Sequence, residues 1–66
     1  MDMKEWTPED IKTLRSSIHL TQTAFGNLLG VTRVHVYYIE KGVRTPSMTL
    51  KLLLNYVQKD HKKGGK

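Results

Sequence analysis

Residues 20–47 read LTQTAFGNLLGVTRVHVYYIEKGVRTPS and describe two short helices joined by a tight turn. Thr21 and Thr32 are of the residue type that caps a helix N-terminus, and each precedes apolar residues at helical spacing. Gly30 and Gly42 follow the two apolar runs, where glycine ends a helix in the left-handed conformation without strain. The segment therefore predicts one helix that ends before Gly30 and a second that begins almost at once.

The apolar residues of this segment predict which side of each helix is buried. They are Ala24, Phe25, Leu28 and Leu29 in the first helix, and Val36 and Ile39 in the second. Gly26 is a poor helix former, but it leaves no side chain where the second helix must approach. We therefore expect the two helices to cross closely at Gly26; the alternative is that this glycine is merely tolerated.

A further helix is predicted upstream of this segment. Thr7 is its expected cap, Pro8 suits the first helical position, and Asp10 lies where it completes a capping box. Its apolar stripe is Ile11, Leu14 and Ile18, with Trp6 just ahead of it. The pattern predicts that this helix ends at about residue 18 or 19.

The last helix is predicted downstream, with Ser47 as its cap. Its core stripe is Leu50, Leu53, Leu54 and Val57. Residues 59–66 are polar, basic and rich in glycine at the end, which predicts a frayed helix end and a flexible tail. The sequence thus predicts one compact all-α domain over residues 1–58, with four helices, or five if a short C-terminal turn forms.

Length and composition exclude several classes of protein. The chain has 66 residues, no cysteine, and 11 Lys and Arg against 6 Asp and Glu, a net charge of +5. A chain this short forms one domain without room for a large catalytic cleft, and without cysteine it has neither a disulfide scaffold nor a zinc finger. Its longest apolar run is three leucines, so we expect a cytoplasmic protein with no membrane span and no signal peptide.

The positive charge is concentrated after the first ten residues. Those ten have a net charge of −3, whereas residues 11–66 carry +8, which suits an anionic partner such as a nucleic acid. The three histidines have no cysteine or acidic partner at ligand spacing, which predicts no metal site. No serine has the setting of a nucleophile. We therefore expect neither an enzyme nor a cofactor.

The predicted helix at residues 33–41 has an unusual exposed face, made of Arg33, Val34, Tyr37, Tyr38 and Lys41. A helix selected for stability alone would carry Ala, Glu or Gln there, and no cation in its first turn. Such clustered departures from local rules are expected at functional sites, and this face suits the major groove of DNA. The alternatives are that Tyr37 packs against the 42–46 loop and that Lys41 is an ordinary helix-end cation.

Each residue type on this face has a chemistry that fits DNA. Arg33 can donate two hydrogen bonds to guanine, while Val34 and the Thr32 methyl group suit a thymine methyl group. Tyr38 offers a ring and a hydroxyl group to a base edge or a phosphate. Cations and the polar groups at the start of the preceding helix suit phosphates, and the expected phosphate contacts are Gln22, Thr23, Lys41 and Arg44.

Residues 20–47 resemble the helix-turn-helix segment of proteins of the Cro and lambda-repressor type, the XRE family. With the flanking helices, the resemblance covers about residues 7–58. It implies a helix-turn-helix unit at about residues 21–41, with the helix at 33–41 lying in the major groove of double-stranded DNA. It also implies a cytoplasmic protein of bacterial, archaeal or phage origin.

The resemblance assigns roles to individual positions. The residue matching Gln22 contacts phosphate in relatives, and an Arg and a Glu matching Arg15 and Glu40 form an internal ion pair. The positions that read bases match Thr32, Arg33, Val34 and Tyr38. The chain departs from the family in carrying His19 where many relatives have Gly and Gly26 where Ala is commoner. Relatives often have polar residues at 34 and 38, so their base preferences do not transfer.

The predicted last helix has a second apolar stripe, made of Met48, Leu52 and Tyr56, four residues apart and away from the core direction. A twofold dimer through this stripe would place two recognition helices about 34 Å apart on a near-palindromic site, as the resemblance also implies. The alternatives are scattered surface residues, or a stripe covered by the segment around Trp6.

These observations favour a DNA-binding transcription regulator, a repressor rather than an activator, that occupies its operator as a homodimer. The main alternative is an antitoxin of the same fold, whose stripe at Met48, Leu52 and Tyr56 binds a toxin protein. A protein-interaction module without a DNA role is a third class. It would be expected to expose acidic residues where this chain has bases and tyrosines.

Overall fold

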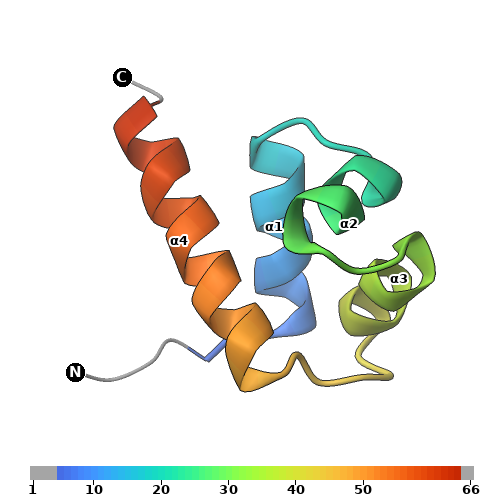
Figure 1. Cartoon of the computed structure of the whole chain (residues 1–66). Coiled ribbons are helices and arrows are strands. Elements are labelled where there is room, and N and C mark those ends of the chain that lie inside the picture. The colour runs from blue at the N-terminus through green and yellow to red at the C-terminus, as the bar shows by residue number, and fades with distance from the viewer. Residues whose placement is uncertain (1–4, 65–66) are drawn as a thin grey trace.

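The chain forms four α-helices, and the structure, a computed structural model, describes residues 5–64 with the side chains of residues 5–60. The helices are α1 (Pro8–Ser17), α2 (Gln22–Leu29), α3 (Arg33–Lys41) and α4 (Met48–Gly64). No strand occurs among the residues described (Figure 1). The predicted all-α class is therefore confirmed.

Each helix begins at its predicted cap. The Thr7 hydroxyl accepts the Asp10 N–H at 3.1 Å, and the Asp10 carboxylate accepts the Thr7 N–H at 3.4 Å, which is the predicted capping box. Thr21 and Thr32 each accept the N–H three residues ahead, both at 3.1 Å. Ser47 does the same at 3.2 Å. These bonds satisfy N–H groups that a helix start leaves without an intrahelical partner.

The turns after the first three helices use left-handed backbone where the sequence predicted it. Gly30 and Gly42 have φ of 78° and 82°. His19 follows α1 with φ of 57° and is the one positive-φ residue other than glycine in the described chain. A histidine tolerates this conformation better than most residues but with more strain than glycine. The turn between α1 and α2 therefore forms despite the missing glycine.

The core lies between the helices and contains nine buried apolar residues: Trp6, Ile11, Leu14, Phe25, Leu29, Val36, Ile39, Leu50 and Leu54. Five predicted core residues are not among the nine. Ile18, Ala24 and Val57 are half-buried, whereas Leu28 is 52% exposed and Leu53 is 38% exposed. The buried side of α2 is formed by Phe25, Gly26 and Leu29, and Leu28 lies outside it. Leu53 lies at the edge of α4 because that helix is covered along one narrow strip only.

The helix α4 is longer than predicted. It continues to Gly64, whereas the sequence predicted a flexible tail from residue 59. No proline or glycine occurs in residues 48–63, so nothing in that stretch interrupts the helix. The helix thus includes residues 59–64, their predicted flexibility stays a prediction, and residues 65 and 66 lie outside the described part. The boundary at 58 between domain and tail stays a prediction.

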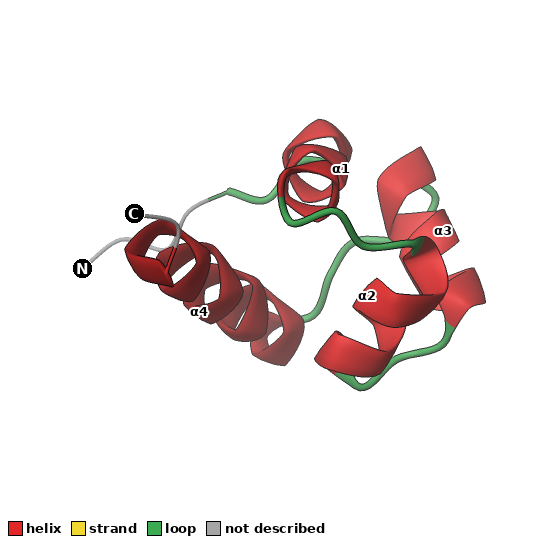
Figure 2. Cartoon of the chain, turned by 90° about the horizontal axis from the view of Figure 1, so that it is seen from above, coloured by secondary structure: helices red, strands yellow, loops and turns green. Residues whose placement is uncertain are grey.

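The helices place α3 and α4 on opposite sides of the molecule. The helix α3 packs on α2 and α1, while α4 packs on α2 from the other side (Figures 1 and 2). The indole N–H of Trp6 donates to the side-chain oxygen of Asn55 at 2.9 Å, which joins the segment before α1 to the middle of α4. The two surfaces singled out in the sequence, on α3 and on α4, are therefore separate.

Candidate nucleic-acid interface

The exposed face of α3 carries the residues that the sequence selected. Val36 and Ile39 are fully buried, whereas Val34, Tyr37 and Tyr38 are 45%, 42% and 39% exposed. Arg33 at the start of the helix and Lys41 at its end are exposed as well. The face therefore presents apolar and aromatic groups between two cations, without a core to cover them.

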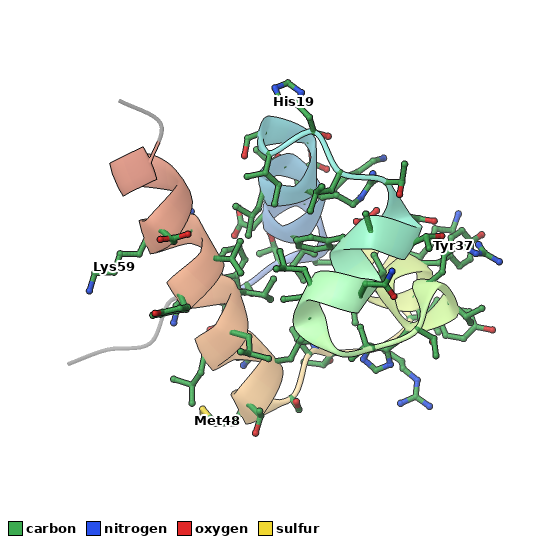
Figure 3. All side chains as sticks on the ribbon, turned by 45° about the horizontal axis from the view of Figure 1, so that its top comes forward. His19, Tyr37, Met48 and Lys59 are labelled. Carbon is green, nitrogen blue, oxygen red and sulfur yellow. The ribbon has the colours of Figure 1, made fainter. Side chains whose placement is uncertain are left out.

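Tyr37 contacts residues of its own helix. Its ring centroid lies 5.9 Å from that of Tyr38, with the rings tilted by 53°. The Lys41 ammonium lies 5.7 Å from the Tyr37 ring centroid, within the range of a cation–π interaction. In Figure 3 the labelled Tyr37 lies at the outer edge of the molecule on the α3 side. The Lys41 ammonium thus lies beside the Tyr37 ring, although Lys41 as a whole is exposed.

Thr32 has a structural task as well as its predicted contact. Its hydroxyl oxygen accepts the His35 N–H at 3.1 Å and caps α3. The hydroxyl hydrogen and the methyl group stay available, because Thr32 is exposed. Arg33 and Val34 follow it directly, so the three side chains lie in the first turn of α3, the part of a recognition helix that contacts base edges.

The loop after α3 is held against the helix end. The N–H groups of Val43 and Arg44 both donate to the carbonyl oxygen of Tyr38, at 3.0 and 3.3 Å. Because of this bond Arg44 lies close to the C-terminal end of α3, and its side chain is exposed. Val43 is 69% exposed, and the sequence reasoning passed over it. An apolar residue in a short loop between Lys41 and Arg44 was the signal that could have drawn attention to it.

The predicted ion pair between Arg15 and Glu40 is confirmed. Arg15 donates through Nε to Glu40 Oε2 at 2.6 Å and through Nη2 to Oε1 at 3.1 Å. Its Nη1 also donates to the carbonyl oxygen of Leu20 at 3.0 Å. The Glu40 side chain is only 5% exposed, so the one acidic residue of α3 faces inward and is neutralised there. It leaves the outer face of α3 without a negative charge.

The start of α2 holds the remaining predicted contacts. Thr23 is exposed, while Gln22 is half-buried and donates through Nε2 to Glu40 Oε1 at 3.2 Å. The sequence predicted Gln22 as a phosphate contact and did not foresee this internal bond. Gln22 and Thr23 nonetheless lie together at the N-terminus of α2, where backbone N–H groups and the helix dipole favour an anion.

Gly26 has the close neighbour that the sequence predicted. A Cβ at this position would lie 2.7 Å from the carbonyl oxygen of Val31 and 3.2 Å from the carbonyl carbon and oxygen of Thr32. All three atoms belong to the backbone of the turn and cap before α3. The absence of a side chain at Gly26 therefore fixes how closely α2 approaches the start of α3, and the alternative of a merely tolerated glycine is wrong.

Two other kinds of site have no support in the described residues. No three His, Asp or Glu side chains there lie close enough together to bind a metal ion. No helix there is long and apolar enough to span a bilayer.

Two short helices crossing at a glycine, with the second one exposed and flanked by cations, define a helix-turn-helix DNA-binding domain. Residues 11–59 match the family model described as Helix-turn-helix (HTH_3). This match covers most of the chain, so the chain belongs to that family, of the Cro and lambda-repressor or XRE type, whose members are DNA-binding transcription regulators. Comparison with curated proteins and with solved structures found no match.

Proposed function

We propose that this protein is a repressor that binds a near-palindromic operator as a homodimer, with α3 in the major groove. The observation that carries the proposal is the face of α3, where Val34, Tyr37 and Tyr38 are exposed between Arg33 and Lys41. An exposed face of apolar and aromatic groups indicates a partner that covers it. The major groove of DNA can accommodate the rings beside base edges, and its phosphates attract the flanking cations.

Sequence would be read by the first turn of α3 and by Tyr38. Arg33 is exposed at the first position, where its guanidinium can donate two hydrogen bonds to guanine O6 and N7. Val34 and the Thr32 methyl group suit a thymine methyl group, because the Thr32 hydroxyl already serves as a cap. Tyr38 adds a ring and a hydroxyl group one turn later. These four residues are the proposed base-reading set.

The duplex backbone would be held from both ends of the motif. Lys41, beside the Tyr37 ring, and Arg44, held by its N–H on the Tyr38 carbonyl, supply cations at the end of α3. Gln22 and Thr23 supply hydrogen-bond donors at the start of α2. Such contacts position the protein without reading sequence, and they make the affinity depend on salt.

The dimer would form through the stripe Met48, Leu52 and Tyr56 on α4. These side chains are 62%, 53% and 72% exposed, so the described residues, Trp6 among them, leave most of the stripe uncovered. Pairing two α4 helices across a twofold axis leaves both α3 helices outward. Each must then lie about 17 Å from the axis, half of one DNA turn, which a molecule 32 Å long accommodates.

Repression follows from occupancy alone. A dimer whose two α3 helices lie about one turn apart covers more than one turn of DNA, so on a promoter it excludes other proteins and needs no contact with polymerase. The test is selection of bound sequences from random duplex DNA at fixed salt, repeated with Arg33→Ala and Lys41→Ala.

We expect Arg33→Ala to relax one base position in each half-site at a cost of about 1–3 kcal/mol. Lys41→Ala should weaken all sequences alike and reduce the salt slope by about one. Selection that enriches no sequence, or an unchanged preference in Arg33→Ala, would show that α3 does not read DNA in this way.

The exposed α4 stripe also suits an antitoxin, which would use it to bind a toxin. The two candidate functions predict different oligomeric states for the isolated protein. A repressor of the proposed kind is a dimer by itself, whereas an antitoxin with this stripe reserved for a toxin is a monomer until the partner is added. Sedimentation of the purified chain, with and without the product of a neighbouring gene, separates them.

A further inference from the structure

The Gln22 side chain has one partner in the structure, Glu40, and a phosphate as its proposed second partner. As a phosphate contact it must donate an N–H, because phosphate oxygens only accept. In the structure its Nε2 already donates to Glu40 Oε1 at 3.2 Å. An amide nitrogen carries two N–H groups, so one can stay on Glu40 while the other donates outward. The internal bond therefore leaves a donor for DNA and fixes its direction.

We propose that Glu40 is a positioning residue for DNA binding, which holds the Gln22 amide so that its second N–H faces a phosphate; this rests on the proposed function. A carboxylate accepts and never donates, so it selects the nitrogen and not the oxygen of the amide as its neighbour. Without that selection the amide would present either atom outward. It would also have to be ordered on binding, which weakens a contact.

Arg15 makes this role compatible with a nearby phosphate. An unpaired carboxylate close to the duplex would repel it, but Arg15 neutralises Glu40 through two hydrogen bonds. The third Arg15 bond, to the Leu20 carbonyl, holds the residue just before the Thr21 cap. The network thus fixes both the side chain of Gln22 and the start of the helix that carries it.

The backbone at this helix start points to the same ligand. Thr21 takes the Ala24 N–H with its hydroxyl oxygen, at 3.1 Å, and the Phe25 N–H with its carbonyl oxygen, at 2.9 Å. Among the described hydrogen bonds, those two leave the N–H groups of Gln22 and Thr23 for an external acceptor. One phosphate at this point would therefore meet two backbone donors and the positioned amide of Gln22.

A double-mutant cycle separates positioning from a purely structural ion pair. One background is the wild-type chain, and the other carries Arg15→Met with Glu40→Met, which removes both charges without leaving one buried and unpaired. In each background Gln22→Ala is made, and the affinity is measured for a duplex of about 20 base pairs carrying the selected sequence. Thermal unfolding of all four proteins gives their stabilities independently.

We expect Gln22→Ala to lower the affinity about tenfold in the wild-type background, as for a hydrogen bond to a charged group. In the background with both Met substitutions, Gln22→Ala should lower the affinity only about threefold or less, because there the amide of Gln22 has to be ordered on binding. Equal losses in both backgrounds would overturn the role of Glu40 while leaving DNA binding intact. A wild-type chain that enriches no sequence would overturn the proposed function and this role with it.

Lys41→Ala is the matched control for a general change in docking. It removes another phosphate contact that does not touch Glu40, so its effect should be the same in both backgrounds. Coupling as large for Lys41 as for Gln22 would mean that the whole interface moves, which contradicts the proposal.

A measurement on the wild-type chain covers the case of a Met variant that does not fold. The side-chain NH2 group of Gln22 should exchange its protons with water more slowly than that of Asn27, which is exposed on the same helix. The slow exchange should persist in the DNA complex. Equal exchange rates for Gln22 and Asn27 would overturn the proposal.

Discussion

Gly26 is the position where one methyl group tests how closely α2 approaches the turn. In Gly26→Ala, the new Cβ would lie 2.7 Å from the Val31 carbonyl oxygen, far inside a normal contact. That oxygen belongs to the backbone, and the Val31 N–H donates back to the Gly26 carbonyl at 2.9 Å. The turn therefore cannot retreat without lengthening this bond, and α2 cannot move outward without opening the core at Phe25 and Leu29.

The size of the effect follows from two opposing terms. Overpacking costs about 1–3 kcal/mol in general, and we take the upper part of that range, about 2–3 kcal/mol, because the atoms that must move are backbone. Replacing glycine by alanine inside a helix returns about 1 kcal/mol. We expect a net loss of about 1–2 kcal/mol, which lowers the melting temperature of a domain this small by about 5–15 °C.

Thermal and urea unfolding followed by circular dichroism measure this loss. The control is Asn27→Ala, which raises helix propensity at the neighbouring exposed position without a clash, and should leave the stability equal or slightly higher. If Gly26→Ala is as stable as the wild-type chain, the close approach does not constrain the motif.

Three further predictions concern other parts of the molecule. Leu52→Lys should convert a dimer to a monomer in sedimentation and weaken operator binding about tenfold or more, whereas Leu28→Lys, at an equally exposed leucine on α2, should do neither. A dimeric Leu52→Lys would place the interface elsewhere. His19→Gly should raise stability by about 0.5–1 kcal/mol by relieving the left-handed backbone, and an unfolding midpoint that does not rise would argue against strain there. Trp6→Phe should cost about 0.5–1.5 kcal/mol through the lost bond to Asn55, in addition to the loss of buried indole atoms, and the hydrogen-bond part should vanish when Asn55 is already Ala.

The helix boundaries of the motif were predictable because they depend on local chemistry. A threonine cap satisfies N–H groups within three residues, and a glycine relieves strain at one backbone position, so both effects act within a few residues of sequence. Thr21, Thr32, Gly30 and Gly42 accordingly mark the helix ends that the structure has. The later end of α4 escaped prediction because nothing local stops that helix before its first glycine.

Burial and side-chain partners were harder to predict because they depend on the arrangement of helices. Leu28 fits the apolar spacing of α2, but the buried side of that helix contains Gly26 and leaves Leu28 outside. The bond between Gln22 and Glu40 joins residues 18 apart in the sequence and depends on how α2 crosses α3. No spacing rule within one helix could reveal it.

The cap of α3 has a consequence for how such a protein can change its operator. Thr32 lies in the proposed base-reading set, yet its hydroxyl also holds the start of the helix, so most substitutions there would weaken the fold together with the contact. Val34 and Tyr38 have exposed side chains that cap no helix in the described chain, although the Tyr38 ring contacts that of Tyr37. New binding preferences should therefore arise first at 34 and 38, with position 32 confined to residues that can still cap.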